Sequence, residues 1–184
     1  QVVEFGRLAL VLDALKAGAA DFTFTNATEA RAKDMAFTPP LIQLELGYLV
    51  PPGSAIASVA DVDRAAHRVG VTEGSSSQGV LTRTFKQAVV APVASIKRGQ
   101  EMLRQGKLDA FATNKGILFE MADELPGFRV LDGRWGLENL AIAIPKGREV
   151  ALPFLRQFAQ DVKASGQLQA IITRAGLRGT ARPD

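Results

Sequence analysis

Cysteine is absent from this sequence, and histidine, tryptophan and tyrosine are each nearly so. Without cysteine the chain can form neither a disulfide nor a thiolate metal site. The single histidine, His67, leaves little scope for a histidine-based catalytic triad or a metal centre built from several histidines. We therefore expect no metal and no other cofactor.

Long apolar runs are also missing, so the sequence shows no membrane span, and no signal peptide is visible. The chain begins with Gln1 rather than Met, and we expect that an upstream segment such as a signal peptide has been removed from it. The 22 basic and 19 acidic residues give a net charge of +3, which mildly favours anionic ligands. The basic residues are scattered, which argues against nucleic acid as a partner.

The main candidate site lies in residues 21–31. Their first half alternates apolar and hydroxyl residues as a short buried strand does, with Phe22 and Phe24 on one face. Thr28 can cap a helical turn, and Arg31 follows within one turn of the strand's carboxyl end. Open α/β sheets bind ligands at that end, so Arg31 predicts an anion site. From these residues alone, a solvated surface arginine is an equally good interpretation.

Apolar periodicity and turn residues predict alternating strands and helices along the chain of 184 residues. We expect strands at 2–5, 21–25, 41–50, 68–72, 89–93, 109–113, 129–131 and 139–144. We expect helices at 7–16, 58–62, around 80–85, and at 95–105, 115–124, 152–165 and 167–174, and a frayed tail at 178–184.

This alternation favours an α/β fold with parallel sheets and helices on their faces. The long extended runs 41–50 and 139–144 bracket the middle of the chain and predict two discontinuous lobes. We set lobe 1 at 1–46 with 145–184, and lobe 2 at 47–144. A hinged cleft that closes around a small ligand is the expected motion.

Further candidate ligand contacts follow later strands. Residues 74–77, a glycine and three serines, precede a predicted helix and offer backbone N–H groups and hydroxyls to an anion, although most such turns only cap the helix. Asn114 and Lys115 follow the strand at 109–113, and we expect Lys115 to be solvated. Trp135 is interpreted as core or cover more readily than as a ligand contact.

Six short motifs, in order, resemble the family 3 extracellular solute-binding proteins of bacteria. They are DFTFT at 21–25, EAR at 29–31, FTPP at 37–40, VGVTEGSS at 69–76, GKLDA at 106–110 and IAIPKG at 142–147. The resemblance covers residues 2–177 and implies the two-lobed type II periplasmic-binding fold with two hinge-crossing strands. It further implies a periplasmic protein that captures a small carboxylate or amino-acid-like ligand in the interlobe cleft and delivers it to the membrane permease of an ABC importer.

The resemblance also implies roles for individual residues. Arg31 would bind the ligand's carboxylate, with Thr25 or Asn26 as helper. Asn114 stands where the family has an aspartate for the ligand's ammonium, so a carboxylate without a free α-amino group is the expected ligand. The residues that would complete the site are Ser75, Ser76, Ser77 and the acidic Glu138.

Two alternatives remain open. One is a ligand-sensing domain of a signalling receptor. The other is a dehydratase of the prephenate or arogenate type, for which Glu138 is the best candidate acid and Glu73 a poorer one. The enzyme ranks last, because no matched acid and base pair is apparent.

The family's opening strand and helix have no counterpart before Val2. The chain is then either a fragment or has a first lobe that is built differently. We expect the chain either to self-associate as a homodimer by strand exchange, because an uncovered sheet edge pairs readily with another chain, or to bind ligand poorly.

Overall fold

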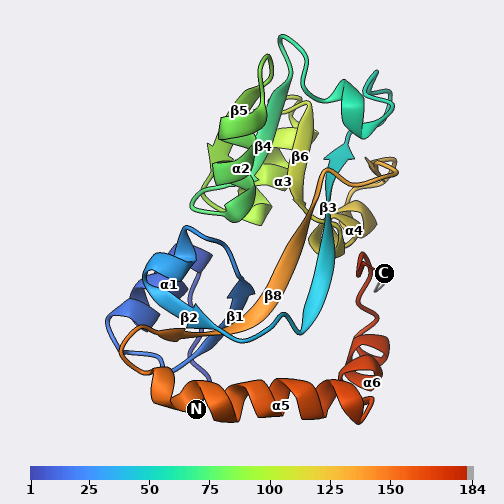
Figure 1. Ribbon diagram of the computed structural model, residues 1–184. Helices are drawn as coiled ribbons and strands as arrows, with labels where there is room; N and C mark the ends of the chain where they lie inside the picture. Colours follow the sequence, from blue (N-terminus) through green and yellow to red (C-terminus); the bar gives the residue numbers. More distant parts are fainter. Residues whose placement is uncertain (182–184) are drawn as a thin grey trace. The chain divides into compact units, whose positions relative to one another are not determined.

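The computed structural model describes residues 1–181 and divides into two compact units (Figure 1). Unit 1 comprises residues 1–43 and the chain from 138 onward, and unit 2 comprises residues 44–137. The strands β3 (Ile42–Val50) and β8 (Gly136–Pro145) run from one unit into the other. The sequence prediction placed the two boundaries at 46/47 and 144/145.

Unit 2 is built on three parallel strands in the spatial order β6, β4, β5. These are β4 (Arg68–Thr72), β5 (Val89–Val93) and β6 (Ala110–Asn114), and each leads into a helix: α2 (Ser76–Thr84), α3 (Ile96–Arg104) and α4 (Lys115–Glu124). The antiparallel strand β3 extends the sheet beyond β6 and also pairs with β7 (Arg129–Val130). The short helix predicted at 58–62 is a 3-10 helix, η2 (Val59–Asp61), which begins with a capping box at Ser58.

The core of unit 2 lies on both faces of this sheet. Val69 and Val71 point into one apolar cluster, which includes Tyr48 and Leu81. Gly70 faces the other way, where an added Cβ would lie 2.5 Å from Leu108. The glycine therefore lets the second cluster, around Leu108, Phe111 and Leu118, pack directly against β4.

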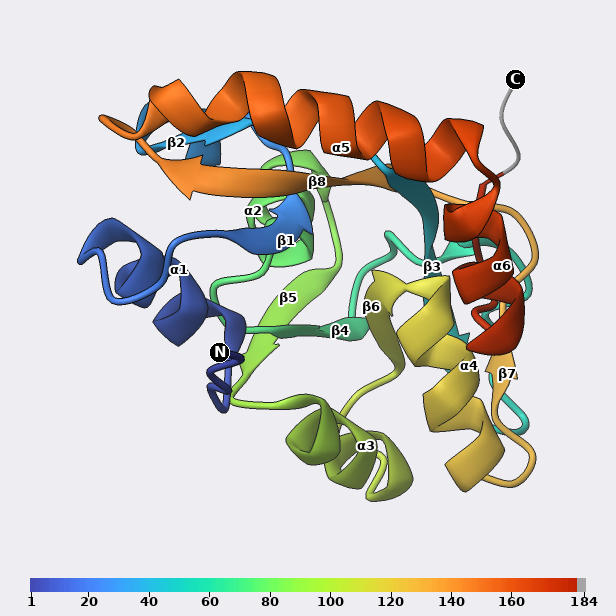
Figure 2. The ribbon, with the colours of Figure 1, turned by 90° about the horizontal axis from the view of Figure 1, so that it is seen from below.

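Unit 1 contains only antiparallel strand pairs among its described residues. β1 (Thr23–Asn26) and β2 (Met35–Phe37) both pair with the returning strand β8, and η1 (Arg31–Lys33) lies between them in sequence. The prediction of parallel sheets is therefore wrong for unit 1 and correct for β4, β5 and β6. The remaining elements are α1 (Leu8–Lys16), η3 (Glu149–Ala151), α5 (Leu152–Ala164) and α6 (Gln167–Arg174), and Figure 2 shows α5 running alongside β8.

Three predictions for unit 1 are wrong. Residues 1–5 form no strand, and Val2 is 87% exposed. Phe22 and Phe24 are more than half exposed, because their side chains stand on a face of the strand that no other element covers among the described residues. The tail is not frayed as far as Ala181, whose N–H donates to the carbonyl of Gln43; residues 182–184 lie outside the described part.

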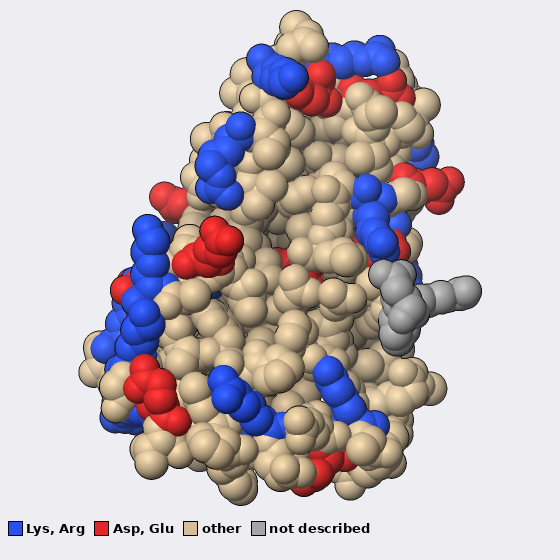
Figure 3. Space-filling model, in the orientation of Figure 1, with Lys and Arg blue, Asp and Glu red and all other residues tan. Residues whose placement is uncertain are grey.

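Charged side chains are dispersed on the face drawn in Figure 3, with acidic groups interspersed among the basic ones and no continuous basic stripe. Several of these charges pair locally, as Lys16 does with Asp34 and Arg148 with Asp21. Within residues 1–181, none of the helices is long and apolar enough to cross a membrane.

Candidate functional site

Arg31 lies at the start of η1 in unit 1, and its guanidinium is held by the end of β1. Nη1 donates to Oγ1 of Thr25 at 2.9 Å and to the carbonyl of Asn26 at 3.1 Å. Both acceptor residues are buried, with Thr25 at 3% and Asn26 at 7% exposure. Thr28 organises the turn as predicted, since its hydroxyl and its carbonyl accept the N–H groups of Arg31 and Ala32.

The rest of the Arg31 guanidinium has no acceptor within residues 1–181. Burial lowers the pKa of Arg31, and the negative charge of Glu138 opposes this shift. The side chain nevertheless remains a cation, because arginine does not deprotonate in proteins. A half-buried cation that is oriented at one nitrogen and open at the others suits a planar, bidentate anion such as a carboxylate.

Asn26 connects this site to the crossing strand β8 through a hydrogen bond. Its side-chain oxygen accepts the N–H of Asn139 at 2.9 Å, and the next residue, Ala27, donates to the carbonyl of Asn139. Glu138 precedes Asn139 on β8, so the pairing of β1 with β8 keeps Glu138 near Arg31. The structure thus brings Arg31, Thr25, Asn26 and Glu138 together within unit 1.

The glycine and serine turn of unit 2 caps α2. Ser75 Oγ accepts the N–H of Gln78 at 3.1 Å, and the Gln78 side chain accepts the N–H of Gly74 at 2.7 Å. Gly74 has a positive φ of 74°, which glycine adopts without strain. The Ser75 hydroxyl and the Gly74 N–H, two of the groups predicted to receive an anion, therefore already make hydrogen bonds at the start of α2. Ser76 is the first residue of the helix, and Ser77 is buried.

Asn114 is the N-cap of α4, and its side-chain oxygen accepts the N–H of Ile117 at 3.1 Å. Lys115 follows it and is only 8% exposed, so the expectation of a solvated lysine is wrong. Its ammonium group lies 2.9 Å from Glu45 Oε2, and Arg134 contacts the same carboxylate at 3.3 Å. The hydrogen bond from Lys115 lowers the pKa of Glu45.

Sequence reasoning missed Glu45, although a lone charge within the apolar run 41–50 was a usable signal. Gly47, on the same face of β3, makes room for the lysine: a Cβ there would lie 3.0 Å from Cγ of Lys115. Trp135 donates its ring N–H to the carbonyl of Gly47 and packs against Tyr48, with ring centroids 6.0 Å apart. Trp135 is therefore partly buried against the core of unit 2, in agreement with its interpretation as core or cover.

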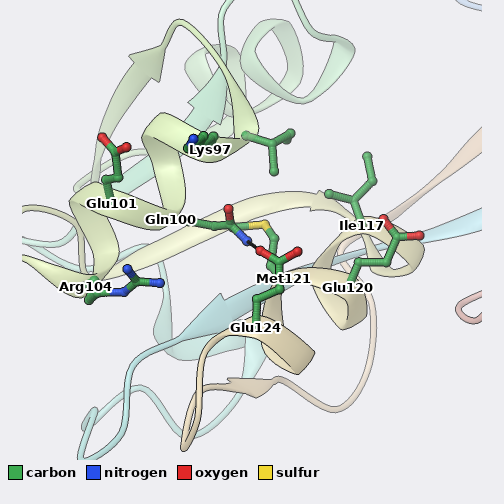
Figure 4. A pocket seen from close by; sticks show the side chains of 9 residues that line it. Lys97, Gln100, Glu101, Arg104, Ile117, Glu120, Met121 and Glu124 are labelled. Atoms are coloured by element: carbon green, nitrogen blue, oxygen red, sulfur yellow. Dashed lines mark hydrogen bonds between the residues drawn. The ribbon is translucent and has the colours of Figure 1, made fainter.

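Each unit also has a surface cavity away from these residues. In unit 2 a groove of about 560 Å³ runs between α3 and α4, with Ile117 and Met121 among its apolar lining and a hydrogen bond from Gln100 to Glu124 across it (Figure 4). In unit 1 a pocket of about 640 Å³ lies between residues 40–43 and α6. The lining of neither cavity includes Arg31 or Asn114.

Several curated proteins are similar to this chain in sequence, whereas no family model matches it. The glutamine-binding protein GlnH of an ABC transporter of Bacillus subtilis is 26% identical over 144 residues, which are 78% of this chain and 52% of that protein. A glutamine-binding protein of Geobacillus stearothermophilus is 28% identical over 65% of this chain and 45% of its own length. The chain spans about half the length of these relatives.

Solved structures of binding proteins share the fold. The substrate-binding protein of an amino acid ABC transporter matches with a TM-score of 0.83 at 17% identity, over 95% of this chain and 78% of that one. AbpA of Streptococcus pneumoniae, bound to L-arginine, matches at 0.80 and 20% identity, over 90% of this chain and 71% of that one. An ancestral amino acid-binding protein, AncCDT-1, is described as a precursor of cyclohexadienyl dehydratase. It matches with a TM-score of 0.82 at 20% identity, over 95% of this chain and 76% of that one.

These matches confirm the predicted fold and the resemblance stated from the motifs. The sequence relatives are named as binding proteins rather than enzymes. The chain has the type II periplasmic-binding fold and is similar in sequence to glutamine-binding proteins, one of them of an ABC transporter.

Proposed function

We propose that this protein is a solute-binding protein that captures a small carboxylate or amino-acid-like ligand and delivers it to an ABC importer. The observation that carries the proposal is the guanidinium of Arg31, which Thr25 and Asn26 hold at Nη1 and whose other nitrogens have no acceptor within residues 1–181. The names of the sequence relatives, which are binding proteins for glutamine and histidine, support the same function.

The site is already organised for an anion before the ligand arrives. Two buried acceptors already fix Nη1. Few rotatable bonds of the arginine side chain therefore lose freedom when a carboxylate binds, which keeps the entropic cost of binding low. The contact would be charge-assisted and bidentate, the strongest kind of hydrogen bond available to a carboxylate here. We therefore assign the ligand's carboxylate to Arg31.

The other contacts remain proposals that rest on the family resemblance. Ser75 and Asn114 each use a side-chain oxygen to cap a helix, and we propose that both residues also contact the ligand. Ser76 and Ser77 are proposed as further hydrogen-bond donors. Glu138 is proposed as the acidic contact, because it is the carboxylate whose charge acts on Arg31.

Calorimetry on the purified protein tests the function directly. We expect reversible binding of at least one probe among L-glutamine, L-histidine, L-arginine and 2-oxoglutarate, with no chemical change of the probe over hours. Mass spectrometry of small molecules released on denaturation should identify a carboxylate. Absence of binding to every probe, together with no released carboxylate, would refute the proposal. Conversion of a probe or of prephenate would instead favour the dehydratase.

We further propose that the protein acts outside the cytoplasm, in the periplasm, and that a transporter permease is its partner. The support is that a sequence relative and several structural neighbours are named as binding proteins of ABC transporters. Capture of the purified permease complex by the ligand-loaded protein, and weaker capture without ligand, would be the expected result.

We also propose a homodimer in which residues 1–5 of each copy pair with the open edge of β1 in the other. These residues form no strand, Val2 and Val3 are 87% and 56% exposed, and the exposed Phe22 and Phe24 lie just before and within β1. An open edge and an unpaired apolar segment complement each other as strand and template.

Light scattering across a hundredfold range of concentration tests this dimer. Val3→Pro removes one backbone donor and should shift the protein toward monomer. Val150→Ser removes an equally apolar side chain, exposed to 93%, at a distance from that edge in the sequence and should leave the mass unchanged. A monomer at every concentration tested would rule the dimer out.

A further inference from the structure

The groove between α3 and α4 is a feature of unit 2 that the candidate ligand site does not use. Its volume is about 560 Å³, and all of its lining comes from these two helices. Ile96 and Ile117 are partly buried in it, and Met121, which is 1% exposed, lies at its base. The helices have nine and ten residues, so the groove has an apolar floor along a length of about 15 Å.

The two sides of this groove carry opposite charges. Lys97 and Arg104 stand on α3, and Glu120 and Glu124 stand on α4 (Figure 4). In the part of the chain that the structure describes, the side chains of Lys97, Arg104 and Glu120 make no ion pair and no hydrogen bond. Glu124 accepts a hydrogen bond from the neutral Gln100 at 3.0 Å. The groove therefore leaves charges of both signs without a counter-charge.

The acids of α4 are placed unfavourably for the free protein. Glu120 and Glu124 lie one helical turn apart, so they repel each other, and both stand toward the carboxyl end of the helix, where the helix dipole favours cations. No basic residue in the last turn of α4 offsets them. On α3, by contrast, Glu101 pairs with Arg98 at 3.1 Å. Glu120 thus gains nothing from the fold of unit 2, and its charge suits a contact with another molecule.

We propose that this groove docks a helical segment of the transporter permease. The docked helix would place an apolar ridge on the floor, basic residues beside α4 and acidic residues beside α3. A small ion does not suit the groove, because one side repels the charge that the other attracts, whereas a helix can carry one sign on each flank. A segment of about two to three turns matches the length of α3 and α4. The inference rests on the proposed function and adds to it the surface of unit 2 that meets the partner.

A charge swap across the groove tests the proposal. Lys97→Glu combined with Glu120→Lys reverses one charge on each side and leaves the net charge unchanged. Binding of the ligand-loaded protein to the purified permease complex in lipid nanodiscs should weaken about tenfold. The matched control, Arg83→Glu combined with Asp132→Lys, makes the same charge changes at exposed positions outside the groove and should leave this affinity unchanged. Calorimetry with L-glutamine and 2-oxoglutarate should give the same ligand affinities for both double variants and the wild type.

Glu120→Gln separates a docking role from a structural one. It should weaken permease binding about threefold, and the difference from the wild type should shrink as the salt concentration rises, because a contact between exposed charges is screened. The midpoint of thermal unfolding should stay constant or rise, because the substitution removes a charge that the helix dipole and Glu124 disfavour. A lower midpoint with unchanged permease binding would assign Glu120 a structural role and contradict the proposal.

Three further results would overturn the inference. Equal effects of the groove swap and the control swap on permease binding, or no effect of the groove swap, would refute the docking surface. A change in the mass of the protein alone on the groove swap, measured by light scattering, would show that a second copy occupies the groove instead. If the wild type does not bind the permease at all, the proposed partner fails and this inference fails with it, whereas calorimetry still tests ligand capture by itself.

Discussion

Replacing Arg31 by alanine is the most direct perturbation of the candidate site. The change removes the cation and both hydrogen bonds from Nη1, to Thr25 at 2.9 Å and to the carbonyl of Asn26 at 3.1 Å. Charge-assisted hydrogen bonds contribute about 1.5–3 kcal/mol, so the dissociation constant for a carboxylate ligand should rise about 10- to 100-fold. The buried acceptors lose their donor as well, which should lower the free energy of unfolding by about 1 kcal/mol.

Arg31→Lys separates the effect of the positive charge from that of the hydrogen-bond geometry of the guanidinium. Lysine keeps a positive charge but cannot donate two parallel hydrogen bonds to a planar anion, so its loss of affinity should fall between those of the wild type and the alanine variant. Arg156→Ala, an exposed position on α5, controls for the loss of one positive charge. Titration calorimetry gives the affinities and urea unfolding gives the stability. A folded Arg31→Ala variant with unchanged affinity would refute the role of Arg31.

Two further predictions concern the groups that follow β6. Glu45→Gln should destabilise the protein by about 2 kcal/mol at neutral pH, because it leaves the buried Lys115 unpaired. Since the folded-state pKa of Glu45 is lowered, the stabilising effect of its carboxylate is present above the ordinary carboxyl range and is lost as the pH falls through the lowered pKa. In urea unfolding, the stabilities of the variant and the wild type should therefore converge in acid. Glu101→Gln, which breaks an exposed ion pair, should change the stability little. Asn114→Asp should keep the α4 cap, improve binding of L-glutamine and weaken binding of 2-oxoglutarate in calorimetry; equal effects on both probes would contradict a contact with the ammonium group.

Local patterns predicted the elements of unit 2 well. The strands β4 and β5 have the bounds expected from their apolar residues and flanking turns, because both are short apolar runs bounded by polar segments. The turn that carries Arg31 was also predictable, because Thr28 and the end of β1 are close in sequence. Its partners Thr25 and Asn26 followed from the family resemblance.

Long-range packing decided the features that the sequence did not predict. Phe22 and Phe24 alternate as a buried strand does, but burial needs a layer that covers the face on which they stand, and both side chains are more than half exposed. The burial of Lys115 depends on Gly47 and Glu45, which β3 brings beside α4 through the pairing of Leu46 with Asn114. No pattern local to Lys115 carries that information, and a lysine at the start of a helix is ordinarily disfavoured by the helix dipole.

The internal pairing of these charges bears on the ligand's own charge. Lys115 is neutralised by Glu45, so it does not add the free positive charge that the sequence had suggested beside Asn114. Glu138 already acts on Arg31, so it offsets part of the charge that would attract a carboxylate. A ligand ammonium that bound in unit 1 would draw Glu138 away from Arg31. In unit 2, the side chain proposed as its contact is the neutral amide of Asn114, whose oxygen caps α4. Desolvating an ammonium without a dedicated counter-charge is costly, which favours an acid that lacks a free α-amino group. The relative affinities for L-glutamine and 2-oxoglutarate measure this balance directly, and tighter binding of L-glutamine would show that Glu138 provides the counter-charge after all.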